Sequence, residues 1–341
     1  MQITTVGVDL AKNVFQVHGV DDHGHVVLRK ALKRSQVMTF FAQLPVCLIG
    51  MEACGSAHHW ARRFQDQGHT VRLMAPQFVK PYVKTNKNDA ADAEAICEAV
   101  QRPSMRFVAV KTAEQQAVLS LHRARQGFVK ARTATANQIR SLLTEFGIAL
   151  PPGIAHLSMA CERMAQEELP DSLRRLIDNL LSHYRQLDTR VVELEREIHA
   201  WHRSSEASQR LAAIPGVGLL TATAVAASLG DARQFKNARQ MAAFLGLVPR
   251  QHSSGGKPTL LSISKRGDVY LRTLMIHGAR SVLHHTAARP QAERFWHVQI
   301  MQRRNRNIAA VALANKNART MWALLAQSQA YDPLHRAAQA A

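Results

Sequence analysis

The sequence predicts an α/β domain followed by a long, mostly α-helical chain, and three features support this prediction. Short β-type runs alternate with helical segments up to about residue 75. An apolar heptad pattern begins after Pro170. Residues 211–341 carry 17 basic and only 4 acidic side chains and contain further helical patterns. With 341 residues, the chain is long enough for two or three domains with separate cores.

The N-terminal β-type runs predict a sheet of mixed direction. The first three runs, at residues 3–10, 13–20 and 26–32, are separated by turn residues and predict a meander. The segments that follow alternate between helix and strand: a helix near 35–43, a strand at 46–51, a helix near 56–67 and a strand at 70–75. This alternation predicts parallel strands. A meander followed by β-α-β order is typical of an RNase H-like sheet.

Two long helices are predicted in the middle of the chain. Residues 112–147 are polar and helical, and a Pro-Pro-Gly turn follows them. In the second helix, apolar positions step by three and four residues, which predicts a coiled-coil seam. These positions are Leu173, Ile177, Leu180, Tyr184, Leu187, Val191, Leu194, Ile198 and Trp201. The seam can pair with helix 112–147 inside one chain or join two protomers, and the sequence leaves both versions open.

Beyond Ser204 the sequence predicts a compact helical domain with a helix-hairpin-helix. Residues 211–225 contain Pro215, Gly216 and Gly218, which permit a tight turn whose backbone N–H groups can bind phosphate oxygens at a helix start. The alternative is an ordinary Pro-Gly turn between two core helices. Further helices are predicted near 237–246, 268–287 and 306–327. We therefore expect three domains, at residues 1–110, 111–204 and 205–330.

Four acidic residues of the N-terminal domain form the predicted catalytic centre. Asp9 lies on the face of strand 3–10 opposite to the strand's valines, and Glu52 directly follows the strand that is expected beside it. Asp89 and Asp92 stand at i, i+3 spacing and share one helix face. Crowded carboxylates repel one another without cations. They therefore predict Mg²⁺ binding, and two such ions can stabilise the attacking and leaving oxygens of a phosphodiester.

Each acid also has a simpler interpretation. Asp89 could cap its helix, while Asp92 could favour the positive end of the helix dipole. Asp9 could be a turn residue and Glu52 a surface carboxylate. Because acids stand together at two strand ends and on one helix turn, the metal site is favoured over these separate roles.

The loop at residues 251–258, QHSSGGKP, is a second candidate site. Its glycines permit a backbone to approach a phosphodiester closely, and Lys257 can offset phosphate charge. Ser253 or Ser254 can attack phosphorus if a base or metal activates the hydroxyl. An ordinary Ser-Gly loop is the alternative.

The charge balance is strongly basic. Lys and Arg number 44 against 25 Asp and Glu, which gives +19 and a pI near 10.6 and favours a polyanionic partner. The excess is C-terminal, and the candidate nucleic-acid contacts lie there: Gly216, Gly218, Lys257, Lys265 and Arg266. The cysteines show no zinc-ligand spacing, and we interpret them as packing residues in a reducing compartment. Without a signal peptide or apolar span, a cytoplasmic protein with no membrane partner is expected.

Five segments resemble one known family in the same order along the chain. They are GVDLAKNVFQVH around Asp9, GMEACGS around Glu52, KNDAADAEAI around Asp89 and Asp92, then IPGVGLLTA and FLGLVPRQHSSGGK. These motifs are similar to those of the DEDD-type insertion-sequence transposases, also called bridge-RNA-guided serine recombinases. The resemblance extends from about residue 3 to about residue 325, and five separate matches make it specific.

The resemblance implies a RuvC-like RNase H-fold domain whose metal-binding acids are Asp9, Glu52, Asp89 and Asp92. It also implies a C-terminal transposase domain with a serine nucleophile, which corresponds to Ser254, while the preceding serine is its rival. A covalent phosphoserine link to DNA conserves bond energy, so that strands are rejoined without ATP. The implied partners are donor and target DNA, a noncoding bridge RNA, and further copies of the chain. The copies assemble from dimers to a tetramer in which acids and serine meet across subunits.

The sequence therefore predicts a Mg²⁺-dependent transposase that excises and inserts its mobile element. One alternative is a Holliday-junction-type endonuclease, in which water replaces serine and no protein link forms. An actin-like or sugar-kinase-type ATPase is disfavoured, because GVDLAKN is followed by no matching second phosphate loop. A noncatalytic helix-hairpin-helix scaffold is the third alternative, in which the acids have no catalytic role.

Overall fold

The computed structural model describes residues 2–84, 88–287 and 295–332 of the chain. The chain divides into two compact units. Unit 1 contains residues 1–116 and 229–234, and unit 2 contains residues 117–228 and 235–341. Unit 1 thus holds the N-terminal domain, whereas the long helices and the basic C-terminal region both belong to unit 2.

Unit 1 is built on a six-stranded sheet with the order β3-β2-β1-β4-β5-β6. The strands are β1 Thr5–Leu10, β2 Val14–Val20, β3 Val26–Lys33, β4 Leu48–Glu52, β5 Thr70–Met74 and β6 Phe107–Val108. The first three form an antiparallel meander, β4 and β5 run parallel to β1, and β6 is antiparallel to β5. The predicted RNase H-like mixed sheet is confirmed. The sixth strand was not predicted, because two residues give no periodic pattern.

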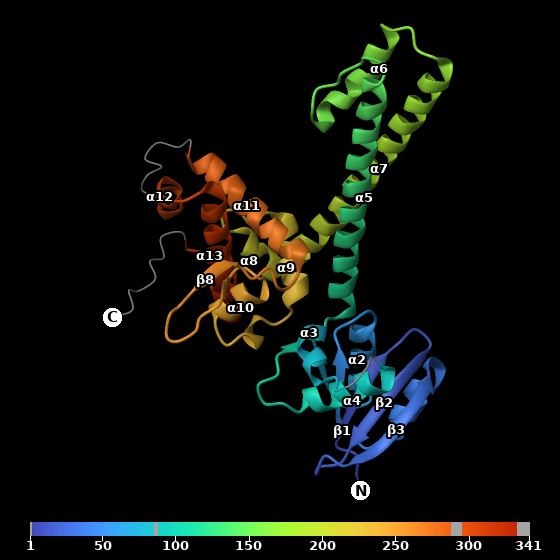
Figure 1. Cartoon of the computed structure of the whole chain (residues 1–341), viewed down its shortest axis with the longest axis vertical. Coiled ribbons are helices and arrows are strands. Elements are labelled where there is room, and N and C mark those ends of the chain that lie inside the picture. Colours follow the sequence, from blue (N-terminus) through green and yellow to red (C-terminus); the bar gives the residue numbers. More distant parts are fainter. Residues whose placement is uncertain (1, 85–87, 288–294, 333–341) are drawn as a thin grey trace. The chain divides into compact units, whose positions relative to one another are not determined.

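Helices cover both faces of this sheet (Figure 1). They are α1 Val37–Ala42, α2 Ala57–Asp66, α3 Pro76–Val79 and α4 Asp89–Val100, with 3-10 turns at Arg34–Gln36 and Lys80–Tyr82. On one face, the valines of β1 pack with aromatic residues of α1 and α2, among them Phe41, Trp60 and Phe64. On the opposite face, α4 buries Ile96 and Val100 against the sheet. The predicted helices near 35–43 and 56–67 are confirmed.

Unit 2 is mostly helical, as predicted. Its helices are α5 Ala113–Thr144, α6 Met159–Ala165, α7 Asp171–Ser204, α8 Glu206–Ala212, α9 Leu219–Leu229, α10 Ala238–Phe244, α11 Val269–Ala287, α12 Trp296–Arg303 and α13 Arg306–Ala326. A 3-10 turn at Ile154–Ser158 precedes α6, and another at Ala232–Gln234 follows α9. One hairpin, β7 Pro249–Gln251 and β8 Leu260–Ile263, interrupts the helices. The sequence patterns predicted neither this hairpin nor α6 and α12.

The prediction that the cysteines are packing residues holds for two of the four. Cys47 and Cys97 are buried as expected of packing residues, whereas Cys54 and Cys161 are exposed, so the packing interpretation is wrong for these two. Over the described part of the chain, no helix combines the length and the apolar character needed to cross a bilayer.

The apolar seam of α7 packs against α5 of the same chain. Ile139 and Leu143 near the end of α5 share a buried cluster with Leu173 and Ile177 near the start of α7, so the helices are antiparallel. Arg125 and Arg132 of α5 form ion pairs with acids of α7, Glu195 and Asp188. The structure therefore contains the seam as an intrachain pairing of α5 and α7, and no second protomer is needed to bury it.

A buried hydrogen-bond network joins α5 to the C-terminal helices. His122 is only 1% exposed, with Nε2 3.0 Å from the hydroxyl of Thr223 on α9 and Nδ1 3.0 Å from the hydroxyl of Tyr270 on α11. The Thr223 hydroxyl donates to the carbonyl oxygen of Leu219, so it accepts from Nε2–H, and Nδ1 accepts from Tyr270. Burial, with a smaller contribution from the charge of Arg125, lowers the pKa of His122 to about 4. The imidazole is therefore neutral at pH 7.

Acid should destabilise unit 2 through His122. Its pKa rises from about 4 in the folded chain to 6.5 on unfolding, so the stabilisation is complete above pH 6.5 and is lost as the pH falls toward 4. Between pH 7 and pH 5 the free energy of unfolding should fall by about 2 kcal/mol from this group. Urea denaturation of the wild type and of His122→Gln at both pH values measures the difference. Equal pH dependence in the two proteins would contradict this role.

Candidate active site

The first turn of α4 presents two of the predicted acids. Asn88 is the N-cap residue: its side-chain oxygen accepts from the Ala90 N–H at 3.0 Å, and its carbonyl oxygen accepts from the Asp92 N–H at 2.9 Å. Asp89 is therefore not the capping residue that the simpler interpretation required. Both acids stand in the first helical turn, where the positive end of the helix dipole stabilises carboxylates.

Asp9, Asp89 and Asp92 converge into one acidic cluster. Each offers a carboxylate oxygen, and these oxygens lie within 4.8 Å of one another. Asp9 and Asp92 are half-buried and Asp89 is exposed. A Mg²⁺ ion bound at about 2.1 Å places opposite ligand oxygens about 4.2 Å apart. The donor set is made of hard carboxylate oxygens at nearly this spacing, so these residues fit Mg²⁺ or Mn²⁺.

Two glycines let α4 come close enough to the sheet to form this cluster. A Cβ atom at Gly7 would lie 2.2 Å from the Ala93 carbonyl oxygen, and one at Gly50 would lie 2.7 Å from the Val100 Cβ atom. The glycines are register partners in β1 and β4. Asp9 lies two residues beyond Gly7 on the same strand face. The sequence interpretation missed this contact, although a glycine inside a strand often marks close approach of another backbone.

Glu52, the fourth predicted acid, occupies the corresponding position on β4. The parallel register pairs Val8 with Met51, so Asp9 and Glu52 follow as the next residues on the two adjacent strands, with side chains toward the same face. Burial raises the pKa of the Cys54 thiol, and the charges of Glu52 and Asp9 add to this rise. Glu52 does not belong to the 4.8 Å cluster among the residues that the structure describes. Its role as a metal ligand is a prediction.

Other acids of α4 are engaged elsewhere. Lys84 Nζ lies 3.2 Å from a Glu94 carboxylate oxygen and 3.5 Å from one of Glu98, and Arg102 lies 2.6 Å from Glu98. These acids form ion pairs with surface cations, and the oxygens of the cluster acids converge on one another at a different part of the helix. The helix therefore carries an ion-paired group of acids and a separate convergent group.

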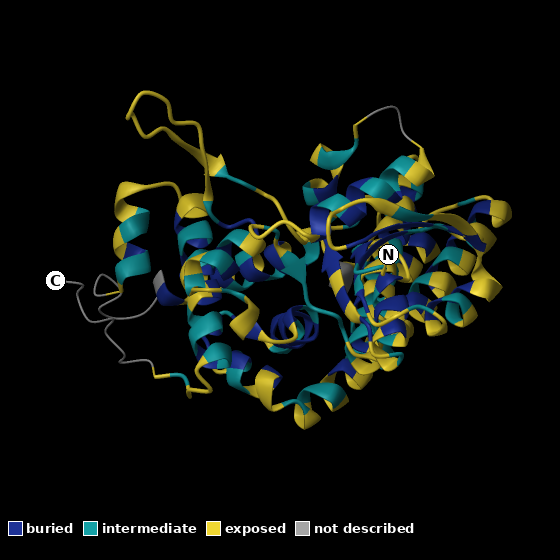
Figure 2. Ribbon diagram, turned by 90° about the horizontal axis from the view of Figure 1, so that it is seen from below, coloured by how far each residue is buried: buried dark blue, intermediate teal, exposed yellow. Residues whose placement is uncertain are grey.

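The predicted serine loop lies at the tip of the β7–β8 hairpin. Residues 249–262 are all exposed, and the hairpin is coloured accordingly in Figure 2. Its base is fixed by buried or half-buried groups. Asn315 donates to the Leu247 carbonyl oxygen at 3.1 Å, and the buried Arg272 donates to the carbonyl oxygens of Leu245 and Arg266. An exposed tip is thus held by an anchored base.

The two adjacent serines have different surroundings. The Ser253 hydroxyl oxygen accepts from the Thr259 backbone N–H at 3.1 Å and from the Gln251 side-chain amide at 3.0 Å. Within the described ranges, no hydrogen bond engages the Ser254 hydroxyl, while the Ser254 carbonyl oxygen accepts from the Lys257 N–H at 3.0 Å. Ser253 therefore shapes the loop, and Ser254 keeps its hydroxyl available.

The turn between α8 and α9 contains the predicted phosphate-binding glycines. Gly216 has a φ of +85° and packs against α11, where a Cβ atom at Gly278 would lie 1.8 Å from the Gly216 carbonyl oxygen. Gly216 thus serves packing of the turn, whereas a Cβ atom at Gly218 would meet nothing within 4 Å. The turn lines a pocket with His277 and Ser281. Phosphate binding at Gly216 and Gly218 is a prediction, as are contacts from the exposed Lys257, Lys265 and Arg266.

The mixed sheet and its convergent acids define unit 1 as a DEDD-type nuclease domain, and comparison with known proteins places it in a family. A family described as "Transposase", of the DEDD type found in IS110 elements, matches residues 6–148. A second family, described as "Transposase IS116/IS110/IS902 family", matches residues 208–297. Both halves of the chain therefore have their counterparts in one group of transposases.

Full-length relatives agree with this assignment. The chain is 57% identical to the "Probable family 20 transposase" of Pseudomonas aeruginosa, over 98% of this chain and 100% of the relative. It is 47% identical to the "Transposase for insertion sequence element IS1111A" of Coxiella burnetii, over 96% and 91%. It is 43% identical to the "Transposase for insertion sequence element IS1328" of Yersinia enterocolitica, over 97% and 99%. The chain belongs to the IS110 family and is an insertion-sequence transposase, so DNA is its partner.

Removing one charge from the acidic cluster should weaken metal binding. Asp92→Asn leaves two carboxylates to hold the cation, and because ligand charge sets the affinity of such sites, we expect the Kd for Mn²⁺ to rise at least about tenfold. Isothermal titration of Mn²⁺ into the full chain measures this change.

Glu98→Gln is the matched control for this titration. It neutralises an acid of the same helix that lies in the ion-paired group, so the Mn²⁺ affinity should equal that of the wild type. Equal affinities for Asp92→Asn and the wild type, with both folded by circular dichroism, would exclude the cluster as the metal site.

Proposed function

We propose that this transposase is a Mg²⁺-dependent DNA recombinase that exchanges strands through a covalent phosphoserine intermediate. Asp9, Asp89 and Asp92 hold the metal, Glu52 completes the acid set, and Ser254 is the nucleophile. The single observation that carries this proposal is the convergence of three carboxylates to within 4.8 Å at the end of an RNase H-like sheet.

The acids supply a fixed binding site for cations at the scissile phosphodiester. Mg²⁺ held by these carboxylates would supply charge stabilisation for a phosphodiester that undergoes displacement. Asp9 belongs to a central strand, and Asp89 and Asp92 to the first turn of a packed helix. Because these elements are rigid, the carboxylates are positioned before DNA arrives.

The serine carries the covalent step. The Ser254 Oγ forms a bond to phosphorus, and one P–O bond to a deoxyribose breaks. The hydroxyl proton passes to solvent, and the departing deoxyribose oxygen takes up a proton to become a free hydroxyl. Attack by a deoxyribose hydroxyl on the phosphoserine reverses these changes and releases Ser254. Each phosphodiester that is broken is replaced by a phosphoester, so joining needs no external energy source.

Two observations support Ser254 over Ser253. The Ser253 hydroxyl oxygen already accepts two hydrogen bonds inside the loop, and its loss would disturb the turn. Ser254 lies at an exposed tip between that turn and Gly255, whose φ of +55° gives the loop a conformation that side chains rarely adopt. A nucleophile in this position can reach a phosphodiester that approaches from solvent.

The remaining parts of the proposal are the bridge RNA and the assembly of dimers into a tetramer. The five-segment resemblance supports both. The 17 basic against 4 acidic side chains of residues 211–341 support a nucleic-acid surface that includes Gly218, Lys257, Lys265 and Arg266. The surface also includes Gly216, whose packing against α11 shapes the turn that presents the backbone N–H groups.

The alternative activity is a metal-dependent endonuclease that uses water in place of serine. The acidic cluster is equally suited to that reaction. The exposed serine hydroxyl on the anchored hairpin favours the recombinase, because a hydrolase that uses water as the nucleophile needs no such group.

Trapping of a protein–DNA adduct tests the serine step. Wild-type protein incubated with Mg²⁺, labelled DNA and the element's noncoding flank RNA should carry label through denaturing electrophoresis. Ser254→Ala should abolish the adduct, because the hydroxyl of Ser253, the other serine of the loop, is engaged in hydrogen bonds inside the turn. Normal cleavage by Ser254→Ala with no adduct in the wild type would establish the hydrolase instead.

Ser253→Ala is the control for this assignment. It removes two hydrogen bonds of the loop but keeps the Ser254 hydroxyl, so a reduced yield of adduct is expected. Full adduct formation by Ser254→Ala together with none by Ser253→Ala would reverse the assignment of the two serines.

Asp9→Asn should abolish strand exchange and leave nucleic-acid affinity close to that of the wild type. The amide keeps the size of the side chain but removes a charge from the metal site. A recombination assay and a DNA-binding titration on the same preparation measure both properties. Strand exchange at the wild-type rate would refute the catalytic role of the cluster.

A further inference from the structure

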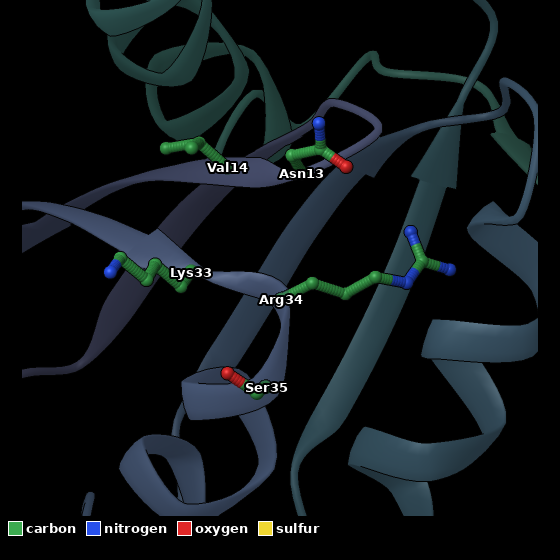
Figure 3. Close-up of a pocket in the computed structure, with 5 residues that line it drawn as sticks. All are labelled: Asn13, Val14, Lys33, Arg34 and Ser35. Atoms are coloured by element: carbon green, nitrogen blue, oxygen red, sulfur yellow. The ribbon is translucent and has the colours of Figure 1, made fainter.

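A pocket lies at one end of the unit 1 sheet, away from the acid-bearing face. It is an open depression of about 590 Å³ where the turn between β1 and β2 meets the end of β3. Its lining residues are Asn13, Val14, Lys33, Arg34 and Ser35 (Figure 3). Two of these five side chains are cationic and two are neutral hydrogen-bonding groups, which suits an anion. Neither the metal site nor the serine hairpin uses these residues.

Arg34 is held in place with hydrogen-bond donors to spare. Its guanidinium carbon lies 5.2 Å from the ring centre of Trp60 and 5.8 Å from that of Phe15. One side-chain nitrogen donates to the Lys12 carbonyl oxygen at 3.3 Å, and the Arg34 backbone N–H donates to Asn13 at 2.9 Å. A guanidinium fixed on aromatic rings presents its other N–H groups in a planar fork that matches phosphate oxygens.

The positive charge of the pocket is not neutralised by neighbouring acids. In the described part of the chain, neither Lys33 nor Arg34 forms an ion pair with a carboxylate, and both are exposed. Figure 3 shows their side chains leaving the end of β3 in different directions. Burial lowers the pKa of nearby His59, and the charges of Arg62, Arg63 and Arg34 lower it further. Several guanidinium groups thus contribute to one positive region.

The sheet topology places the pocket at the same end as the catalytic acids. β3, β1 and β4 all point in one direction, and they end at Lys33, beside Asp9, and at Glu52. Asp9 and Asn13 are four positions apart in the sequence, so their Cα atoms lie at most about 14 Å from each other. A nucleic-acid strand carries one phosphate per about 3.4 Å of helix axis, so this distance corresponds to about four nucleotides.

From these observations we propose that the pocket binds a backbone phosphate of a nucleic-acid strand, a few nucleotides from the phosphodiester that the acids process. Arg34 forms the planar contact, and Lys33, whose side chain leaves β3 in another direction (Figure 3), adds positive charge to the region. This inference rests on the proposed function, since it places the strand with its scissile phosphate at the acidic cluster. The phosphate contact fixes the position of the strand and reads no base.

Salt dependence of binding tests the pocket directly. Titrations of full-length wild type, Lys33→Gln and Arg34→Gln with duplex DNA and, separately, with single-stranded RNA give the slope of log K against log salt concentration. Loss of one phosphate contact should reduce the magnitude of the slope by about 0.9 for duplex DNA or about 0.7 for a single strand. Both variants should also bind several-fold more weakly at low salt. Ca²⁺ in place of Mg²⁺ keeps the nucleic acid intact during the titration.

Arg72→Gln is the matched control. Arg72 is also exposed and also lies over an aromatic ring, 4.7 Å from the centre of Phe107, but it does not line the pocket. Its slope should equal that of the wild type. If Arg34→Gln fails to fold, the salt slope of Lys33→Gln decides the test. Lys33 forms no ion pair among the described residues, so its substitution removes no such contact.

The two nucleic acids distinguish the source of the phosphate. A smaller slope with DNA alone assigns the pocket to a DNA strand, and one with RNA alone assigns it to the guide. Wild-type slopes with both for Lys33→Gln and folded Arg34→Gln, or an equal drop for Arg72→Gln, would overturn the inference. That result leaves the adduct assay unaffected, whereas wild-type strand exchange by Asp9→Asn would refute the proposed function without changing any salt slope.

Discussion

The arrangement of the acids depends on one contact, the close packing of α4 against β1 and β4. A helix normally stands off a sheet by the length of the side chains between them, but here Gly7 lets the α4 backbone lie directly on β1, and Gly50 makes room on β4 for the Val100 side chain of α4. Contact at this range leaves the helix little freedom to slide. The first turn of α4 is thereby fixed beside the end of β1. This packing holds Asp9, Asp89 and Asp92 close together in spite of their mutual repulsion, which a bound cation would relieve.

The serine hairpin, in contrast to the rigid acidic cluster, combines an exposed tip with a fixed base. Its tip has few contacts and exposed backbone, which are the properties of segments with low local stability. Its base is fixed, because Gly246 packs against the Arg266 backbone and the buried Arg272 donates to two carbonyl oxygens. A hydroxyl that attacks a large external substrate needs access more than rigidity. Acids that hold a small cation need their separations fixed before the cation arrives.

Local patterns in the sequence were sufficient for much of the fold. The alternation of β-type runs gave the meander and the parallel strands, and the heptads after Pro170 gave α7. The i, i+3 spacing correctly placed Asp89 and Asp92 on one helix face, but no local pattern could show that Gly7 would bring that face to Asp9. The β7–β8 hairpin was missed because its strands are short and exposed on both sides, so they carry no alternation. Periodicity alone also could not identify α5 as the helix that packs against the α7 seam, because this pairing depends on residues far away in the sequence.

The charges at the end of the unit 1 sheet present an electrostatic problem, because a polyanion must approach three clustered carboxylates. A phosphate a few ångströms from several negative charges is repelled unless cations compensate, and a bound metal compensates only at the cluster itself. Exposed cations such as Lys33 and Arg34, at the end of β3, can attract the backbone a few nucleotides from the reacting phosphate. Attraction and reaction are then assigned to different side chains. The proposed separation predicts that removing a charge from the metal site costs little affinity, whereas a charge in the pocket contributes to affinity without touching the reacting atoms.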